Sequence, residues 1–494
     1  ELGLYDVLVR AHTLQGLACE VPTETVAIYR LLLGILHRVF GPADMDAWHR
    51  LWQAGRWDPE PLQAYLSRWA DRFDLCSPVH PFLQTHDKRV NARWAGDLRH
   101  ETRSADTLFN HNTDDGTYTL SPARAARALV AMHHFGFAGK KGSKMQFTDA
   151  SSTRMITFLV RGENLFQSLL LNMPRYGGDS DPLPNSGSDR LWWEADDPCS
   201  PPRTVPLGYL DYLTWPNRLL ELEWNEQGEV TGLSMGPALR LDGSVLNPLA
   251  AFTRSTESGV HNTVWKEGRA LWRDATALLA SADIVRPRQL DWLAELAEEH
   301  DLPLGRLVPV DGYGMCTLGG KDKVYFYRSE RLALSSALLA DRACSEALVA
   351  SLSQAETVGT ALVRYVKGTP SGVFATLAGY LIAPQQDVGG RQPDSKDVDA
   401  MVLSWAGDGL YWAELEVPFQ QLAVEIGDDL QAARLHWAQA IRGAAWSAFR
   451  SVVQGLPPTP AALKAAVRAQ ASLGALLKRV LELEEQETAQ EEVE

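Results

Sequence analysis

Cysteine is scarce in this sequence, and its spacing excludes two classes of protein. The 494 residues hold five cysteines: Cys19, Cys76, Cys199, Cys316 and Cys344. They are odd in number, lie far apart and include no C-x-x-C pair. The chain therefore lacks both the disulfide density of a small secreted domain and the paired ligands of a zinc knuckle. We expect a reduced, cytoplasmic protein with no metal site.

Long apolar runs are also missing. The longest candidate, residues 26–40, is interrupted by Arg30, His37 and Arg38. A membrane span needs roughly 18 uninterrupted apolar residues, so we expect none. The sequence begins at Glu1 without Met and shows no signal-peptide pattern, and we expect that some N-terminal residues precede it.

Positive charge is in short supply, but not everywhere. Lys plus Arg number 47 and Asp plus Glu 62, so 47 − 62 gives a formal net charge of −15. This balance excludes a stand-alone electrostatic binder of nucleic acid. Residues 134–162 differ, because five basic side chains face one acidic side chain there, a local 5 − 1 = +4. These six residues are Lys140, Lys141, Lys144, Arg154, Arg161 and Asp149. This uneven distribution of charge is compatible with a few basic loops that contact nucleic acid as part of a larger complex.

The pattern of apolar residues and turns changes character at about residue 333. Before it we expect helices at 24–40 (capped by Thr23), 60–74, 123–134 and 266–300, antiparallel strands over 219–254, and a hairpin with arms 307–310 and 324–327. After it, Ala and Leu dominate, and breaks separate helices at 333–367, 371–383, 396–426, 429–453 and 460–485. The prediction is an α+β fold. A large mixed α/β N-terminal domain with short antiparallel strands, residues 1–332, precedes a C-terminal four-helix bundle, residues 333–494.

The motifs contain no convincing catalytic constellation. Residues 232–236 read Gly-Leu-Ser-Met-Gly and match the G-x-S-x-G of hydrolases, but a nucleophile elbow needs a helix after the serine. Here Pro237 follows at once, and another strand and turn come next, so a chance match is the favoured interpretation. A serine hydrolase that uses Ser234 stays as a remote alternative. We predict a protein that is not an enzyme and uses no cofactor.

The segment 136–144 has a composition suited to phosphate. Its three glycines allow the backbone to approach a partner closely, and its three lysines add positive charge. It does not fit the Walker A pattern. On composition alone, an ordinary surface loop is about as well supported as a binding loop.

Four strings, taken in order, resemble the large subunit of the type I-E CRISPR Cascade surveillance complex, the CasA family. The strings are 69–75 (WADRFDL) with 80–84 (HPFLQ), the glycine-rich segment with 157–162 (TFLVRG), 213–216 (LTWP), and 410–415 (LYWAEL) leading to Pro418. They cover nearly the whole chain. The resemblance implies a subunit that is not an enzyme and that works with a guide RNA and other Cascade subunits. It also implies recognition of the protospacer-adjacent motif in double-stranded DNA, strand separation, and recruitment of a helicase-nuclease. An adaptor without direct DNA contact is the alternative.

The resemblance also implies site residues. The DNA-binding glycine loop corresponds to Gly136, Phe137, Ala138, Gly139, Lys140, Lys141, Gly142 and Ser143. A cationic finger corresponds loosely to Arg240, for which a strand ion pair is an equal alternative. A wedge hairpin corresponds to Met315, Cys316, Thr317, Leu318, Gly319, Gly320 and Lys321, with a plain surface hairpin as the alternative. A loop toward guide RNA and neighbouring subunits corresponds to Phe109, Asn110, His111 and Asn112, or else caps its own domain.

Overall fold

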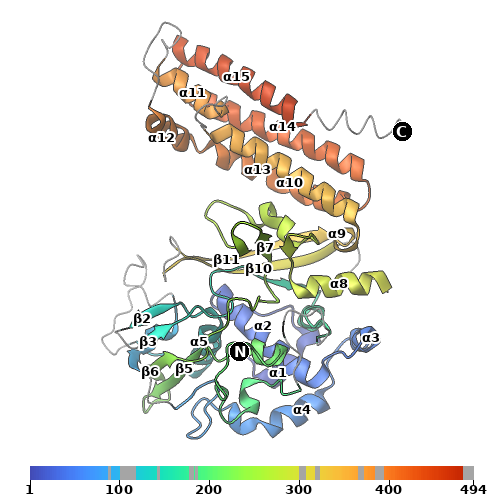
Figure 1. Cartoon of the computed structure of the whole chain (residues 1–494), viewed down its shortest axis with the longest axis vertical. Helices are drawn as coiled ribbons and strands as arrows, with labels where there is room; N and C mark the ends of the chain where they lie inside the picture. The colour runs from blue at the N-terminus through green and yellow to red at the C-terminus, as the bar shows by residue number, and fades with distance from the viewer. Residues whose placement is uncertain are drawn as a thin grey trace. The chain divides into compact units, whose positions relative to one another are not determined.

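The chain forms two compact units, Glu1–Leu332 and Ala333–Glu494, in a computed structural model (Figure 1). The structure describes residues 1–86, 91–100, 118–141, 145–176, 183, 187–299, 307–317, 323–364, 372–383 and 394–481. Within these residues helices and short antiparallel sheets alternate in the first unit, and only helices follow strand β11 in the second. The predicted α+β fold is therefore confirmed.

The first unit is built around helix α2 (Pro22–Phe40), whose residues from Thr23 to Leu36 are almost all buried. Pro22 occupies its first turn after Val21, so the predicted cap at Thr23 was wrong, while Gly41 ends the helix as expected. Arg30 is fully buried in it, and its guanidinium donates to the Tyr212 carbonyl at 2.9 Å. The two Nη groups of the arginine that interrupts the apolar run thus have hydrogen-bond partners inside the protein.

Seven further α-helices are described in the first unit. They are α1 (Leu4–Val9), α3 (Met45–Ala54), α4 (Pro59–Arg68), α5 (Pro122–Phe135), α6 (Leu165–Leu171), α7 (Tyr209–Leu213) and α8 (Arg288–Glu299). No single described helix is long and apolar enough to cross a membrane. Helices α2 and α3, bent by 110°, meet the length and composition requirement only as a pair.

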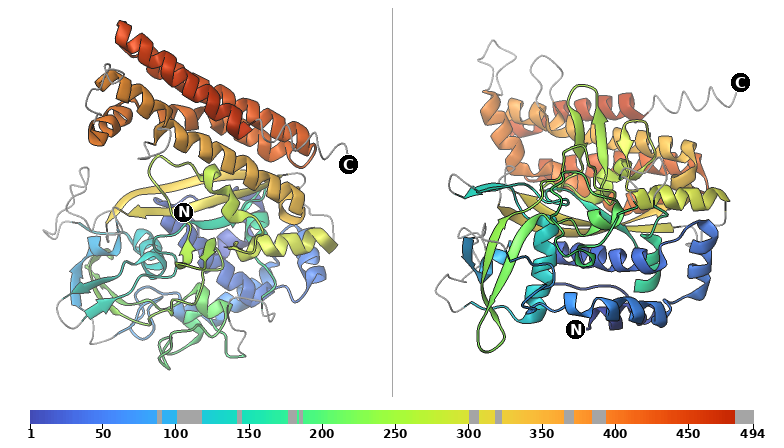
Figure 2. Two further views of the ribbon diagram at one scale, coloured as in Figure 1. Left: turned by 45° about the horizontal axis from the view of Figure 1, so that its top comes forward. Right: turned by 60° about the horizontal axis from the view of Figure 1, so that its bottom comes forward.

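Four small sheets hold the described strands of this unit. They are β1-β6-β5 (Asn91–Trp94, Val230–Pro237, Arg218–Trp224), β11-β10-β4 (Val324–Ser335, Leu307–Thr317, Thr157–Val160), β2-β3 (Gly139–Lys141, Met145–Phe147) and β8-β7-β9 (Gly259–Asn262, Phe252–Ser255, Ile284–Val285). The strand β10 is central in its sheet, with Val310 opposite Val160 and Tyr313 opposite Thr157 in β4. Figures 1 and 2 show the hairpin β2–β3 beside β5 and β6.

The predicted helix over 266–300 was half wrong. A 3₁₀ helix (Leu271–Leu278) and strand β9 occupy its first part, and only Arg288–Glu299 is α-helical. Strand β9 pairs with β7, so residues 284–285 belong to a sheet and not to a helix. Pro287 then fixes where α8 can begin.

The second unit consists of helices, and its long helices run alongside one another (Figures 1 and 2). They are α9 (Ala337–Ala340), α10 (Arg342–Val363), α11 (Val373–Ile382), α12 (Ser395–Trp405), α13 (Gly407–Glu425), α14 (Leu430–Gln454) and α15 (Pro460–Leu481). Four long helices, α10, α13, α14 and α15, make the predicted bundle. The helix expected from residue 333 starts later, because β11 runs to Ser335. The helix expected over 396–426 is broken at Ala406, whose φ of 49° is left-handed.

Candidate nucleic-acid interface

The glycine-rich segment is a β-hairpin with a buried base, not a free loop throughout. Gly136 ends α5, and a Cβ there would lie 2.8 Å from both the Arg218 guanidinium and the Met132 carbonyl oxygen. Phe137 is only 2% exposed and packs with Val26 and Met315. Both residues therefore serve the fold, which corrects their assignment to direct DNA contact. Gly142 and Ser143, together with Lys144, lie outside the described residues.

The outer part of the hairpin leaves the core. Gly139, Lys140 and Lys141 form β2 and lie opposite Phe147, Gln146 and Met145 in β3. A Cβ on Gly139 would meet nothing within 4 Å, so its backbone is open to approach by a partner. The Ala138 N–H donates to Asp149 Oδ1 at 2.6 Å and fixes where the hairpin begins.

A buried arginine that the sequence did not single out holds the hairpin in place. Arg218 is 2% exposed, and its Nη2 donates to the carbonyls of Phe137 at 2.8 Å and Thr148 at 3.0 Å. Its guanidinium also lies over the Phe147 ring, 5.1 Å from the centroid. The two ends of the hairpin are thus tied together by one cation at the start of β5.

The local charge of +4 is not a single basic surface. Arg161 points away from the hairpin, where it binds the Tyr29 hydroxyl and the Gln15 carbonyl and lies 3.5 Å from Asp311. Arg154 stays beside the hairpin, with Nε 3.3 Å from Asp149 Oδ2 and its guanidinium 5.4 Å from the Phe137 centroid. Of the two arginines, only Arg154 can contribute to the same interface as the hairpin.

Arg240 lies on an exposed irregular segment after β6, not on a strand as predicted. Within the described part of the chain it forms no ion pair, which removes the alternative of a strand ion pair. The turn beyond it is well fixed, because Asp242 accepts from the Ser244 N–H at 2.8 Å and the Ser244 hydroxyl at 2.6 Å. These hydrogen bonds lower the pKa of Asp242.

The predicted wedge is partly corrected by the structure. The two arms are strands β10 and β11, longer than expected, so the hairpin itself is present. Met315 is 2% exposed in the core cluster of Val26, Phe135 and Phe137, and it cannot lie at an inserting tip. Cys316 and Thr317 are half-buried at the end of β10. Leu318, Gly319, Gly320 and Lys321 lie outside the described residues.

One pocket lies next to the glycine segment and Arg240 and includes the end of the wedge arm β10. Its volume is about 620 Å³, and its walls come from the segment after β3 (Asp149, Arg154), the turn after Arg240 (Leu241, Asp242) and the end of β10 (Cys316, Thr317). These segments are far apart in the sequence. The resemblance named the glycine segment, Arg240 and the wedge hairpin separately, and residues next to the first two and within the third line this hollow.

The remaining sequence motifs do not add chemistry. Ser234 sits in the middle of β6, opposite Ala92 in β1 and Glu221 in β5, so a strand–turn–helix elbow is absent and the hydrolase alternative fails at this residue. In the described ranges, no group of three His, Cys, Asp or Glu side chains could hold a metal ion. The predicted guide-RNA loop, Phe109, Asn110, His111 and Asn112, lies outside these ranges.

The comparison with known proteins decides the family. A family model for CRISPR-associated protein Cse1 matches residues 1–448. The chain belongs to the Cse1 family. A curated CRISPR-associated protein CasA/Cse1 of Thermus thermophilus is 29% identical over 506 residues, which cover 97% of this chain and 93% of the relative. The predicted resemblance is thereby confirmed.

Solved structures share the fold of this Cse1-family chain. Cse1 of Thermobifida fusca matches with a TM-score of 0.78 at 25% identity, over 97% of this chain and 94% of that one. A chain of a CRISPR RNA-guided surveillance complex matches with a TM-score of 0.72 at 20% identity, over 96% and 94%. The second likeness concerns the fold alone.

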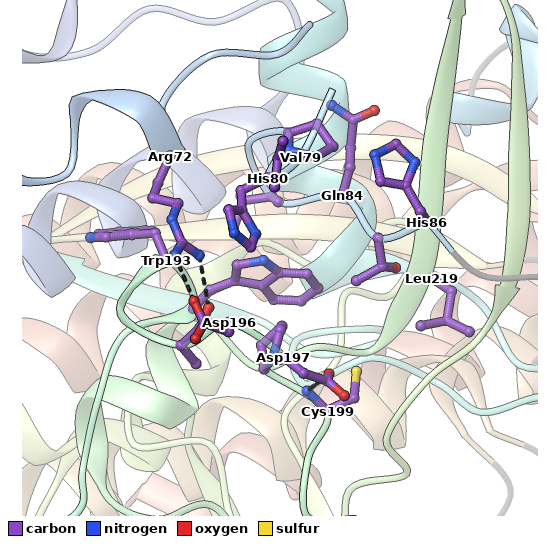
Figure 3. Close-up of a pocket in the computed structure, with 16 residues that line it drawn as sticks. Arg72, Val79, His80, Gln84, His86, Trp193, Asp196, Asp197, Cys199 and Leu219 are labelled. Carbon is purple, nitrogen blue, oxygen red and sulfur yellow. Dashed lines mark hydrogen bonds and ion pairs between the residues drawn. The ribbon is translucent and has the colours of Figure 1, made fainter. Parts of the chain in front are cut away.

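A second pocket of this Cse1-family chain, of about 330 Å³, lies between residues 72–86 and 192–199 (Figure 3). Arg72 Nη2 lies 2.7 Å from Asp196 Oδ1, as the dashed lines in Figure 3 mark. His86 Nδ1 lies 2.6 Å from Glu221 Oε1. Gln84 donates to the Leu75 carbonyl and accepts from the Leu222 N–H, which joins the segment to β5. The side chains of Arg72, Gln84 and His86 are thus engaged with the protein itself.

Proposed function

We propose that this chain is the motif-reading large subunit of a CRISPR RNA-guided surveillance complex. In this role it recognises the protospacer-adjacent motif in double-stranded DNA through the minor groove and promotes separation of the strands. It then recruits a helicase-nuclease that degrades the target. It works in the cytoplasm with guide RNA and other Cascade subunits, and it is not itself an enzyme.

The observation that carries the proposal is the convergence of three elements on one pocket. The hairpin β2–β3, the Arg240 segment and the hairpin β10–β11 were each implied by the family resemblance, and residues next to each of them line the same hollow. An adaptor without DNA contact gives no reason for this convergence. The Cse1 relationship and the likeness to a surveillance-complex chain support the same role.

The chemistry of the β2–β3 hairpin suits a minor groove. That groove is only about 6 Å wide, so a strand with an open glycine such as Gly139 can approach its floor. The donor and acceptor pattern there is degenerate, and we therefore expect tolerance of several motif sequences.

Strand opening needs only a small bias. An RNA–DNA hybrid is about as stable as the duplex that it replaces, so contacts that favour the first opened pairs decide the outcome. The hairpin β10–β11 is suited to supply this bias as a wedge, although not through the buried Met315.

The test is a binding selection with the reconstituted complex. A duplex library with randomised bases beside a guide-matched target would be bound at fixed salt, and the retained sequences would be read. We expect enrichment of a short motif, and loss of that enrichment when Lys140, Lys141 and Lys144 are replaced by Ala. Binding that ignores the flanking bases, or that survives the triple change with its motif intact, contradicts the proposal and favours the adaptor.

A further inference from the structure

We propose that the 620 Å³ pocket receives one unpaired nucleotide of the opened duplex, with its phosphate on Arg154. This rests on the proposed function and adds to it a specific ligand and a specific residue. In this proposal Arg154 binds the phosphate of the nucleotide, a contact that is separate from those of the glycine segment and the wedge.

Arg154 is held in a conformation that its own sequence disfavours. Its φ of 59° is left-handed, a region in which the Cβ of a non-glycine residue crowds the following carbonyl oxygen. The Asn262 side-chain amide donates to the Arg154 carbonyl at 2.7 Å and maintains this turn. Left-handed non-glycine residues concentrate at functional sites, because the surrounding structure must compensate for them.

The Arg154 guanidinium lies over the Phe137 ring, 5.4 Å from the centroid, but its ion pair with Asp149 is loose. Its Nε lies 3.3 Å from Asp149 Oδ2 but forms no hydrogen bond with the described residues, and both side chains are partly exposed, 25% and 40%. Asp149 already accepts the Ala138 N–H at 2.6 Å. A phosphate would offer the guanidinium the two-pronged geometry that Asp149 does not provide.

The interior of the pocket suits a base better than a second charge. Leu241, Leu246, Val260 and Val264 provide apolar wall, and the pocket volume is in the usual range for ligand sites, roughly 300–1,000 Å³. Ser151 also lines it, is 5% exposed, and has a hydroxyl without a hydrogen-bond partner in the described structure.

The acidic residues at the rim would not repel the phosphate strongly. Asp149 lies 3.3 Å from Arg154 and accepts the Ala138 N–H, and Asp242 Oδ1 already accepts both Ser244 donors. Arg240, exposed beside this turn, adds positive charge to the rim. The electrostatics therefore favour an anion at the mouth and a planar group inside.

The native thiol of Cys316 provides a direct test, since it lines the pocket. Target duplexes would carry a disulfide-activated thiol tether on one base, moved one position at a time along each strand beside the motif. In the reconstituted complex, Cys316 would attack the tether disulfide, form a protein–DNA disulfide and release the small thiol. We expect one position on one strand to cross-link well above its neighbours, and Cys316→Ser to abolish that product.

Two surface changes separate a binding pocket from a general effect. Val260 is 49% exposed at the rim, and Val260→Trp should fill the pocket and remove the cross-link while the complex still assembles. Val79→Trp is the matched control, because Val79 is 67% exposed at the other pocket. Arg154→Ala should lower affinity for the opened duplex about tenfold and reduce the salt slope by about 0.7–0.9.

The outcomes distinguish the two proposals. Motif-dependent binding without a position-specific cross-link overturns the nucleotide pocket and leaves the proposed function standing. If the complex with the unaltered protein binds DNA equally well with and without the motif, the proposed function itself is overturned. If Val260→Trp instead blocks assembly with the other subunits, the pocket holds a protein side chain and the inference is wrong.

Discussion

Two pockets of the N-terminal unit, the one of about 620 Å³ and the one in Figure 3, use their arginines in opposite ways. Arg72 makes a 2.7 Å contact with Asp196 and a second hydrogen bond to the Ala195 carbonyl, within a backbone of ordinary conformation. Arg154 has a looser 3.3 Å contact, and its backbone is left-handed. Arg72 therefore stabilises the fold. Arg154 has a strained backbone, and its guanidinium remains able to bind a phosphate. The difference teaches that the quality of an ion pair, not the presence of charge, marks the candidate interface.

The largest effect should come from Arg218, the cation on which the hairpin beside Arg154 depends. Arg218→Ala would leave the buried carbonyls of Phe137 and Thr148 without their donor, so we expect a loss of about 3 kcal/mol in the free energy of unfolding. Urea unfolding followed by tryptophan fluorescence measures it. The stability of Arg218→Lys should lie between those of the unaltered protein and Arg218→Ala. An unchanged unfolding midpoint for Arg218→Ala would mean that the protein does not need the Arg218 hydrogen bonds for its stability.

The next effect should be a loss of stability in acid. Burial lowers the pKa of His37 to about 3 and that of His133, on the helix that carries the hairpin, to about 4. An unfolded histidine titrates near 6.5, so the unfolded state binds more protons below that pH and stability falls as pH decreases. From pH 7 to pH 5 each histidine should cost about 2 kcal/mol.

Unfolding measured at both pH values checks this account. His37→Phe removes the titrating group but keeps an aromatic ring against Tyr209, and it should flatten the pH dependence. The same slope in that variant would show that other groups are responsible. A change at the exposed His12 serves as the control.

A smaller effect on stability is expected when the two left-handed residues, Ala406 and Arg154, are replaced by glycine. Ala406, between α12 and α13, is left-handed like Arg154 but has no polar side chain. Ala406→Gly should stabilise the protein by about 1 kcal/mol, because glycine adopts this conformation without a Cβ clash. Arg154→Gly should gain less, since it also loses the contacts with Asp149 and Phe137. If both variants gain the same stability in thermal unfolding, the contacts of Arg154 with Asp149 and Phe137 do not contribute to the stability of the protein.

The smallest effect should be at the pocket of Figure 3. Asp196 is largely exposed, so Asp196→Asn should leave thermal unfolding and motif-dependent DNA binding unchanged within error. A clear loss of DNA binding in this variant would erase the contrast between the pockets.

Local signals predicted the elements that they control. The helix predicted over 123–134 is α5, which extends one residue further at each end, and the predicted hairpin arms 307–310 and 324–327 lie in β10 and β11. The predicted helix over 266–300 failed in its first half, because pairing of β9 with β7 decides that segment. The periodicity of a segment gives no information about which distant strand it will pair with.

The candidate site was predictable only in outline. Phe137 and Met315 lie beside glycines, and such apolar residues can equally well form a tip or a core. Their burial depends on Val26, far away in the chain. Arg218 was missed because its partner carbonyls, at Phe137 and Thr148, lie 81 and 70 residues earlier. The left-handed turn at Arg154 likewise has no signature in its own sequence.

The most direct measurement compares Arg154→Ala with Asp149→Asn in duplex binding by the reconstituted complex at fixed salt. If Arg154 is held for a phosphate, removing its charge weakens motif-dependent binding, whereas neutralising Asp149 frees the guanidinium and leaves binding equal or tighter. The amide side chain of the Asp149→Asn variant retains an acceptor for the Ala138 N–H, so the hairpin base is kept. Equal losses in both variants would show that the pair only supports the fold, and would contradict the account.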